Sequence, residues 1–478
     1  MSVTEAKSRL AAPNAAQRIP GILIVGGVIF AAALFGILTR PVGFLASFWP
    51  ANAILLGMMV RNPRYAGPAG WAAAFVGYVA ADILTGGGWY VTAWLTAANM
   101  VSAITGYLLF RLVSENDRKL QHPVSVLYLF GICCMAAVAA AFAGGGAVGL
   151  LFDRTFAVGF KLWFVTELVN TLVILPAILT FPGVRSLSVR WPPSDDGLSL
   201  ETILRGAPCL ALILSVAGGV LIGGPGALAF PIPALLWCAL TYSLFTTSVM
   251  TLLLCIWLLI SIPAGLVDLA APADPIRSLD SIRLGIALMA LGPLTVASIN
   301  TGRRELIARL QHIANYDALT GALSRGAFFE RGQARLDELI QGHGNIAVLM
   351  IDLDHFKRVN DEHGHGVGDA ALKAFFPQAS KHLRAGDLIG RLGGEEFAVL
   401  MPSADMIEAT ALAERIRLAV EATEVALPSG EALKFTVSIG VSAHKADAST
   451  SIDAMLAAAD QALYEAKAGG RNQVRVRS

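Results

Sequence analysis

Apolar residues are distributed along this chain in two different ways. Up to about residue 300 they run in long, nearly uninterrupted stretches between short polar loops, whereas after residue 304 they recur with the periods of helices and strands. A helix needs about 20 apolar residues to cross the hydrocarbon core of a bilayer, and most of the stretches have about this length. The pattern predicts a helical membrane region followed by a domain that mixes helices and strands.

The membrane region is expected over residues 19–300, after a cytoplasmic tail of residues 1–18, and to contain about ten spans of about 20 residues each. The ten apolar stretches are Ile19 to Leu38, Val42 to Val60, Ala66 to Leu84, Tyr90 to Leu112, Val124 to Leu151, Val158 to Phe181, Ala207 to Ile222, Ala227 to Thr247, Ser248 to Leu266 and Ile282 to Asn300. Eight spans are the alternative, because the run before Gly223 is short and the region after Ala227 has almost no connecting loop.

Basic residues in alternate loops indicate how the spans are oriented. One set of loops holds thirteen of them: Lys7, Arg9, Arg18, Arg61, Arg64, Arg111, Arg118, Lys119, Arg185, Arg190, Arg205, Arg303 and Arg304. The other set holds Arg40, Arg154, Arg277 and Arg283, with Lys161 close by. Because cytoplasmic loops are enriched in Lys and Arg, both termini are expected in the cytoplasm, for eight and for ten spans alike.

Composition supports the division into two regions. The chain is 55% hydrophobic and 15% charged, but roughly 10% of residues 1–304 are charged against roughly 24% of the rest. A formal net charge of +1 removes any compositional case for nucleic-acid binding, and the high apolar content excludes a disordered chain. All five cysteines lie in the apolar region without metal-binding spacing, so they are expected to be buried as small hydrophobic residues.

Five polar residues are expected at membrane depth, where their burial is costly, and this makes them candidates for a functional site: Asp82, Asn99, Lys161, Glu167 and Asn170. Glu167 and Asn170 are three residues apart and share a helix face, and Lys161 lies nearly two turns earlier on a similar side. Two interpretations remain open. The residues line a ligand pocket or proton-responsive site, or they form interhelical hydrogen bonds that fix the packing.

Residues 301–315 are expected to form a signalling helix that links the two regions. Thr301 to Arg304 mark the cytoplasmic boundary, and Leu306, Leu310 and Ile313 then recur four and three residues apart. This apolar stripe predicts a helix that continues the last span. Two such helices in parallel would transmit a movement of the membrane region to the C-terminal domain.

The C-terminal domain, residues 316–478, is predicted to combine strands and helices. The strand patterns are Ile346 to Asp354, Phe435 to Ser442, and a hairpin over Leu388 to Met401 that turns at Gly393 and Gly394. Helical patterns occupy Arg325 to Ile340, Asp369 to Leu383, Met406 to Ala422 and Ile452 to Ala468. This order predicts an α+β sandwich with one face of the sheet covered.

Four carboxylates lie where these strands end or turn. The first strand offers Asp352 and Asp354, and the hairpin turn offers Glu395 and Glu396. Carboxylates from a strand end and a turn can converge on a hard divalent cation, and Mg²⁺ with a nucleoside triphosphate is the usual reason to gather them. For either pair alone, solvated acids at a turn are the alternative interpretation.

Four stretches of the C-terminal domain resemble the GGDEF family of diguanylate cyclases: DALTGALSRGAFF (Asp317 to Phe329), IDLDHFKRVNDEHGHGVGD (Ile351 to Asp369), RAGDLIGRLGGEEF (Arg384 to Phe397) and YEAKAGGRN (Tyr464 to Asn472). The resemblance implies a palm-like antiparallel sheet flanked by helices, the fold of nucleotidyl cyclases. It also implies the condensation of two GTP molecules into cyclic di-GMP and pyrophosphate. The turn is GGEEF, which keeps a carboxylate at the metal position.

The membrane region resembles the first type of membrane-associated sensor domain of bacterial signalling proteins. The residues that carry this resemblance are Phe48 to Asn52 (FWPAN) and Glu167 to Pro176 (ELVNTLVILP). It implies a multi-pass regulator in the bacterial inner membrane, surrounded by the lipid bilayer.

The resemblance implies a metal site and a catalytic carboxylate. Asp352, Glu395 and the carbonyl of Leu353 would hold two Mg²⁺ ions in each active site, with Mn²⁺ as the alternative ion. Glu396 would lie beside them and assist metal binding or deprotonation of the attacking hydroxyl.

The resemblance also implies a nucleotide site. Asn360 and Asp369 would read the guanine, since a carboxylate can accept hydrogen bonds from both N1–H and the exocyclic amine. The triphosphate would be bound by three cations and by the backbone near Phe356; the cations are Lys357, Lys467 and Arg471.

Control by dimerisation and by product follows from the same resemblance. Each domain would bind one GTP, so two domains of a homodimer, formed through the linker helix and the GGDEF domain, must face each other. Arg384 and Asp387 match the Arg-x-x-Asp motif of an inhibitory site for cyclic di-GMP, with Arg415 as a secondary arginine and Arg391 near this surface. Binding of product there would couple its concentration to the arrangement of the domains.

The resulting hypothesis is a membrane-bound, homodimeric diguanylate cyclase controlled by its membrane sensor and by its product. One alternative is a catalytically inactive domain that only binds GTP or cyclic di-GMP, against which the intact acids argue. A second is a transporter with a regulatory tail, although paired interrupted helices in two similar halves are not evident.

Overall fold

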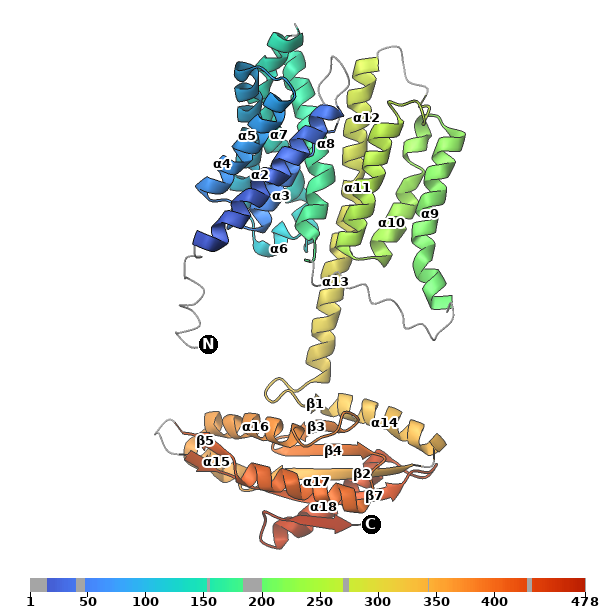
Figure 1. The fold of residues 1–478 in the computed structure, drawn as a ribbon. Coiled ribbons are helices and arrows are strands. Elements are labelled where there is room, and N and C mark those ends of the chain that lie inside the picture. The colour runs from blue at the N-terminus through green and yellow to red at the C-terminus, as the bar shows by residue number, and fades with distance from the viewer. Residues whose placement is uncertain are drawn as a thin grey trace. The chain divides into compact units, whose positions relative to one another are not determined.

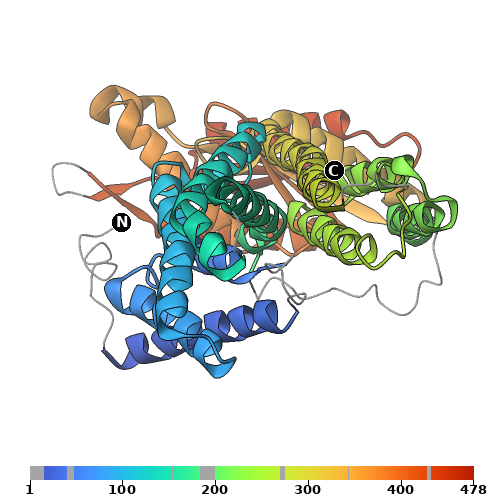
Figure 2. The same cartoon turned by 90° about the horizontal axis from the view of Figure 1, so that it is seen from above.

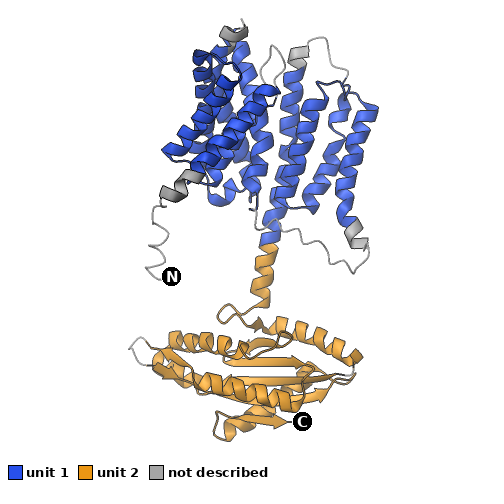
Figure 3. Ribbon diagram, in the orientation of Figure 1, with its two compact units in different colours: residues 1–305 blue, residues 306–478 orange. Residues whose placement is uncertain are grey.

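The computed structural model describes residues 15–39, 48–152, 155–183, 200–269, 275–342, 344–427 and 432–477. They form two compact units, residues 1–305 and residues 306–478 (Figure 3). Several residues used to predict the orientation lie outside the described residues: Lys7, Arg9, Arg40, Arg154, Arg185 and Arg190. The tail predicted over residues 1–18 also falls mostly outside them.

The described part of unit 1 is helical, as the apolar stretches predict (Figure 1). Its helices are α2 (Ala15–Leu38), α3 (Ala51–Arg61), α4 (Pro68–Leu84), α5 (Trp89–Phe110), α6 (Glu115–Arg118), α7 (Pro123–Phe152), α8 (Phe156–Thr180), α9 (Leu200–Ile222), the 3₁₀ helix η2 (Pro225–Leu228), α10 (Pro231–Thr241), α11 (Leu244–Ser261), α12 (Pro275–Met289) and α13 (Leu291–Asn315). Each of the ten predicted stretches overlaps at least one of them.

Length and apolarity separate these helices into two groups. Within the described residues, seven helical segments are long and apolar enough to cross a membrane, and three shorter apolar helices cover Ala51–Arg61, Pro68–Leu84 and Pro225–Thr241. Unit 1 is therefore compatible with a multi-pass membrane protein, and the number of crossings stays a prediction.

Helix α8 is the centre of unit 1. Fifteen of its 25 residues are buried, and it packs against α3, α7, α11 and α12. Seen from above in Figure 2, the blue to teal helices lie on one side and the light green to yellow ones on the other. Close approach depends on small residues, as between α2 and α4, where a Cβ atom on Gly77 would come within 2.7 Å of the Gly26 carbonyl oxygen.

Helix α13 runs unbroken from Leu291 to Asn315, as the stripe of apolar residues predicts. After it, the elements of unit 2 are β1 (Leu323–Ser324), α14 (Arg325–Gly342), β2 (Asn345–Leu353), α15 (Phe356–His363), α16 (His365–Ser380), β3 (Leu388–Gly393), β4 (Glu396–Pro402), α17 (Met406–Glu421), β5 (Glu424–Ala426), β6 (Ala432–Lys434), β7 (Val437–Lys445), α18 (Ile452–Ala468) and β8 (Val474–Arg477).

The main sheet of unit 2 has six strands in the order β1-β3-β4-β2-β7-β8. Strand β2 is antiparallel to both of its neighbours, whereas β1 runs parallel to β3 and β8 runs parallel to β7. Strands β3 and β4 form the predicted hairpin, and a separate pair is made by β5 and β6. This is the α+β arrangement that the sequence predicts.

The expectation that only one face of this sheet is covered is wrong. One set of alternate β2 residues packs with helices α14 and α18, and the other set packs with α16 and α17. Eight of the nine β2 residues are buried. The physical reason is visible in the sequence, since a strand covered on both faces has a continuous apolar run instead of an alternating one.

Candidate active site

Two strands bring the predicted catalytic acids to one end of the sheet. Asp352 is the second-last residue of β2 and only 4% exposed, and it lies directly opposite Glu396, the first residue of β4. Directly opposed residues of an antiparallel pair point to the same face, so their carboxylates face the same side of the sheet. Glu395 precedes Glu396 in the turn after Gly394, whose φ of +44° a glycine adopts readily.

Burial and neighbouring charges act in opposite directions on Asp352. Burial raises the pKa of Asp352 to about 6, the Lys467 ammonium acts against this rise, and the charges of Glu395 and Glu396 add to it. The influence of both glutamates indicates that all three carboxylates share one site. The lysine is needed there because acids gathered in a poorly solvated place repel one another.

Lys467 itself comes from the last turn of α18, and its ammonium lies 2.8 Å from an Asp352 carboxylate oxygen. The sequence assigns this lysine to the triphosphate. In the structure it pairs with Asp352 in the acid cluster.

Asp354, two residues after Asp352, has a different environment. It is buried and accepts hydrogen bonds from the hydroxyls of Thr436 and Ser438 and from the backbone N–H of Asn472. With three donors it is fully occupied within the protein. The structure thus separates the two acids that the sequence grouped together: Asp352 faces the other carboxylates, and Asp354 fixes the loop after α18.

That loop carries Arg471, predicted to bind the triphosphate. Arg471 and Asn472 both have positive φ, at 66° and 43°. The side chain of Asn472 accepts from Arg417 at 2.9 Å and donates to Glu421 at 2.9 Å, both on α17. Asp354 and α17 therefore hold the exposed Arg471 in a strained loop conformation.

The predicted ligands suit a hard cation. Asp352, Glu395 and the Leu353 carbonyl supply only oxygen atoms, as Mg²⁺ prefers. Within the described ranges, no group of three or more His, Cys, Asp or Glu side chains is arranged to hold a metal ion. Because Mg²⁺ is usually bound by one or two carboxylates together with substrate phosphates, the residues fit an ion that a nucleotide helps to hold.

Helix α15 places the residues predicted to bind the nucleotide. Phe356 is its first residue and is buried, while Lys357 next to it is exposed. The Oδ1 atom of Asn360 is buried and has no hydrogen-bond partner among the described residues. A Cβ atom on Gly368 would come within 2.0 Å of this oxygen, so Asn360 lies against the residue that precedes Asp369. The two residues predicted to read guanine are therefore neighbours.

The Arg-x-x-Asp motif forms a compact turn before β3. Arg384 donates its backbone N–H to the Asp387 carboxylate at 2.8 Å, and its guanidinium lies 3.0 Å from Glu408 on α17. Burial raises the pKa of Asp387. Arg415 is exposed on the same helix, seven residues or about two turns after Glu408, and so on the same face. Arg384, Asp387 and Arg415 thus share a surface.

Arg391 has a different role from these three. Its guanidinium lies 3.0 Å from Asp317 and donates to the carbonyl of Gly394 at 2.6 Å and 2.9 Å. The arginine and the hydroxyl and N–H of Thr320 hold the pKa of Asp317 below its usual range against the effect of burial. Arg391 therefore ties the DALTG segment to the GGEEF turn, and its role at the product surface stays a prediction.

The polar residues of unit 1 divide into two groups. Glu167 accepts from Asn52 at 2.8 Å and from Ser102, and Asn170 accepts from the backbone N–H of Trp49. Lys161 does not join them. The expectation that it lies on the side of Glu167 is wrong, because it pairs with Asp280 of α12 at 2.9 Å. Six residues are 600° around a helix, so the two side chains point in clearly different directions.

Comparison with known proteins agrees with this geometry. The model of the family described as "Diguanylate cyclase, GGDEF domain" matches residues 314–473. The probable diguanylate cyclase DgcF of Escherichia coli O157:H7 is 31% identical over 444 residues, which are 91% of this chain and 90% of that protein. The response regulator PleD of Caulobacter vibrioides is 41% identical over 221 residues, 42% of this chain and 48% of that one.

Among solved structures, the coiled coil and GGDEF domain of DgcB from Caulobacter crescentus, in complex with c-di-GMP, is 28% identical with a TM-score of 0.37. The match covers 39% of this chain and 98% of the DgcB chain.

The sheet, with its acids gathered at one end, defines a nucleotide-condensing domain of the cyclase class. Because the chain is similar to DgcF over most of the length of both proteins, it belongs to the GGDEF family of diguanylate cyclases. Its helical N-terminal unit is compatible with a membrane sensor.

Sequence reasoning missed the residues that support the site. Asp317 was visible as the first acid of the DALTG stretch, which the resemblance includes. Arg417 carried no signal of its own, because its role depends on Asn472, which is distant along the chain. Asn52 lies in the FWPAN stretch that the resemblance includes, but its partner Glu167 became visible only in the structure.

Proposed function

We propose that this protein is a membrane-bound diguanylate cyclase that is controlled by its helical unit and by its product. In each half-reaction, the 3′-hydroxyl of one GTP attacks the α-phosphorus of the other. A P–O bond forms, pyrophosphate leaves and the hydroxyl proton is lost, so two GTP molecules yield cyclic di-GMP and two pyrophosphates. The observation that carries the proposal is the alignment of Asp352 with Glu396 beside Glu395.

Each residue has a stated part in the proposed reaction. Asp352, Glu395 and the Leu353 carbonyl would hold two Mg²⁺ ions, and these ions would neutralise phosphate charge and lower the pKa of the attacking hydroxyl. Glu396 accepts the hydroxyl proton or assists the metal ligands. Lys467 acts against the rise that burial causes in the pKa of Asp352.

The nucleotide is proposed to lie along α15. Backbone N–H groups at the start of this helix and the Lys357 ammonium attract the triphosphate, and Arg471 contacts it from the opposite loop. The Oδ1 atom of Asn360, which has no partner in the described part of the chain, and the carboxylate of Asp369 accept from the guanine N–H groups. An adenine offers no matching pair of donors, so GTP is preferred.

Two copies of the domain are required, because each supplies one GTP and the ring closes between them. The exposed apolar stripe of α13 supports a homodimer: Leu306, Leu310 and Ile313 are 57%, 56% and 71% exposed in the single chain. Pairing of two such helices removes this surface from water.

Inhibition by cyclic di-GMP is proposed at the surface formed by Arg384, Asp387 and Arg415. The arginines attract phosphates and the acid accepts from guanine. Product bound there competes with the Arg384–Glu408 ion pair and fixes the two domains in an unproductive arrangement.

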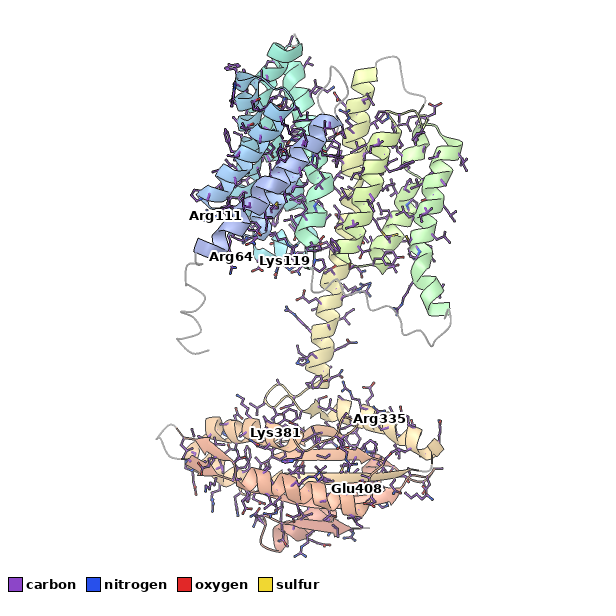
Figure 4. All side chains as sticks on the ribbon, viewed as in Figure 1. Arg64, Arg111, Lys119, Arg335, Lys381 and Glu408 are labelled. Atoms are coloured by element: carbon purple, nitrogen blue, oxygen red, sulfur yellow. The ribbon has the colours of Figure 1, made fainter. Side chains whose placement is uncertain are left out.

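We further propose that the helical unit spans the bacterial inner membrane, with both termini and residues 316–478 in the cytoplasm. Basic residues from separate predicted cytoplasmic loops support this orientation, since Arg61, Arg118, Lys119 and Arg304 line one cavity. Figure 4 labels Arg64, Arg111 and Lys119 at the end of unit 1 from which α13 emerges. Such clustering is expected on the cytoplasmic side.

The test is product analysis on the full chain in lipid nanodiscs with GTP and Mg²⁺. Cyclic di-GMP from the wild type and none from Asp352→Asn supports the proposal. GTP binding without product would favour the receptor alternative. A transporter would instead accumulate a solute in vesicles to the same extent with and without residues 305–478.

A further inference from the structure

Unit 1 contains a cavity of about 90 Å³ between α2, α4, α5, α8 and the segment before α3. A buried water needs roughly 10–15 Å³ of such space, so the cavity holds several waters or a small organic molecule. The residues that give it its chemistry are two acids and three aromatic side chains: Asp82, Glu167, Trp49, Tyr78 and Trp163. The rest of its lining is half apolar and half polar: Ala33, Ile37 and Leu95, and Thr96, Asn99 and Thr166.

Glu167 is almost fully buried and has only neutral partners. Asn52 donates to one carboxylate oxygen at 2.8 Å, and Ser102 donates to the other. Asn52 is itself held, since its Oδ1 atom accepts from Tyr78 at 2.6 Å and from Trp49 at 3.2 Å. These contacts fix the position of the carboxylate without neutralising its charge.

No lysine, arginine or histidine is among the described residues that line the cavity. Asp82 is likewise partnered by a hydroxyl, that of Thr92. Lys161 on α8 is half exposed and pairs with Asp280 of α12, so it does not balance these carboxylates. A cavity with two carboxylates and no cation is costly in an apolar environment unless a positive charge enters it.

Trp163 supplies a second, independent observation. It is 7% exposed and lines the cavity, and its indole N–H has no hydrogen-bond partner in the part of the chain that the structure describes. An indole N–H is a donor only. A buried donor without an acceptor is rare in proteins and points to a partner outside the chain.

We propose that this cavity binds a small organic ammonium ion that carries a hydrogen-bond acceptor, such as an amino alcohol. The ammonium is attracted by Glu167 and Asp82 and by the faces of the aromatic rings. The alkyl body suits the apolar part of the lining, and the acceptor meets the Trp163 N–H. A hard metal ion fits less well, because it requires about six oxygen ligands.

Helix α8, which lines the site, also contacts the helix that precedes α13. Trp163 and Lys161 are two residues apart on α8, and the Lys161–Asp280 ion pair joins α8 to α12, which α13 follows in the chain. A ligand that shifts α8 therefore acts on the element that leads to the cyclase. This part of the inference rests on the proposed control of the cyclase by the helical unit.

Binding is tested on the full chain in nanodiscs by calorimetry, with 4-amino-1-butanol, pentylamine and butyrate as probes. Both amines bind the wild type and butyrate does not. Glu167→Gln and Asp82→Asn each weaken amine binding by at least about tenfold, because each variant removes a carboxylate that pairs with the buried ammonium. The control Glu115→Gln, at an acid 74% exposed, binds as the wild type does.

Trp163→Phe tests the acceptor. The amino alcohol binds the wild type more tightly than pentylamine, and this preference disappears in the variant. No binding by either amine, or equal binding by the wild type and by both acid variants, overturns the site. A preference that persists in Trp163→Phe overturns the role of the indole. Circular dichroism and size-exclusion profiles confirm that each variant is folded.

Cyclic di-GMP output in the same nanodiscs separates this inference from the proposed function. Amine binding changes the output of the wild type, and Lys161→Met keeps the binding but reduces that change. If output is normal and no amine binds, the inference fails while the proposed enzyme stands. If amines bind and output does not respond, the site stands and the proposed control by the helical unit fails.

Discussion

The Asp352 carboxylate lies 2.8 Å from the Lys467 ammonium, at the end of the sheet where Glu395 and Glu396 turn into β4. These residues come from three separate elements, β2, the hairpin and α18. Together they form a small acidic site in which the lysine lies next to the carboxylates.

Removing the carboxylate charge abolishes the cyclase reaction. Asp352→Asn and Glu395→Gln each lower kcat by at least about 100-fold, because charge stabilisation of the transferring phosphoryl group is lost. The measurement is cyclic di-GMP formation at saturating GTP and Mg²⁺. Asp337→Asn, at an exposed acid on α14, leaves the rate unchanged, and a similar rate in Asp352→Asn would refute the role of this residue.

Activity at limiting Mg²⁺ declines as the pH falls through about 6. Burial raises the pKa of Asp352 to about 6, and the neutral carboxyl binds cations poorly. The raised pKa of Asp352 also affects the free energy of unfolding of unit 2 when no metal is bound. The contribution of Asp352 is full at low pH and is lost as the pH rises through about 6. The measurement is kcat/KM against pH at several Mg²⁺ concentrations.

Lys467→Met shifts this acid limb to higher pH, because the ammonium acts to lower the pKa of Asp352. Lys373→Met, at an exposed lysine on α16, leaves the limb where it is. An unshifted profile in the first variant would argue that Lys467 does not interact with the acid in solution.

Asp354 contributes to stability and to the position of Arg471. Asp354→Ala leaves the donors of Thr436, Ser438 and Asn472 without their acceptor, and we expect the free energy of unfolding to fall by about 1–3 kcal/mol. Urea unfolding measures this. The control Thr436→Val removes a single hydrogen bond and lowers the free energy of unfolding by about 0.5–1.5 kcal/mol. We also expect KM for GTP to rise more in Asp354→Ala than in this control.

The two arginines of the RAGDLIGR stretch have different effects when removed. Arg384→Ala relieves inhibition by cyclic di-GMP and keeps the initial rate, because its side chain is exposed and pairs only with Glu408 among the described residues. Arg391→Ala lowers the initial rate itself, since it releases Asp317 and the carbonyl of Gly394. Initial rates measured with and without added cyclic di-GMP distinguish the two. Equal behaviour would contradict the separate roles.

Charge on the α13 stripe is expected to disrupt the proposed dimer. Leu310→Glu alters a residue that is 56% exposed in the single chain, so we expect folding to be kept and the dimer fraction and cyclase rate to fall together. Light scattering and product formation are the measurements. Gln311→Glu adds the same charge one position along the helix and leaves both values near those of the wild type.

The sequence alone predicted much of the fold and of the site. Apolar stretches predicted the helices of unit 1, and the GGEEF hairpin and the β2 strand were predicted close to their observed bounds. These features could be predicted because helix and strand periods, turn residues and motif spacing are properties of short segments. The covering of both sheet faces was missed, although the unbroken apolar run of β2 carried that information.

The partner of each charged side chain was decided only by the tertiary structure. Asp352 and Asp354 look alike in sequence, yet one faces three charged groups and the other is held by hydroxyls and a backbone N–H. Arg391 meets Asp317 across 74 positions of the chain, and Lys161 meets Asp280 instead of Glu167. Local pattern determines which elements form and which residues have the chemistry to react. The path of the chain determines which of them meet, because an ion pair or hydrogen bond requires a separation of a few ångströms in space, whatever the separation in sequence.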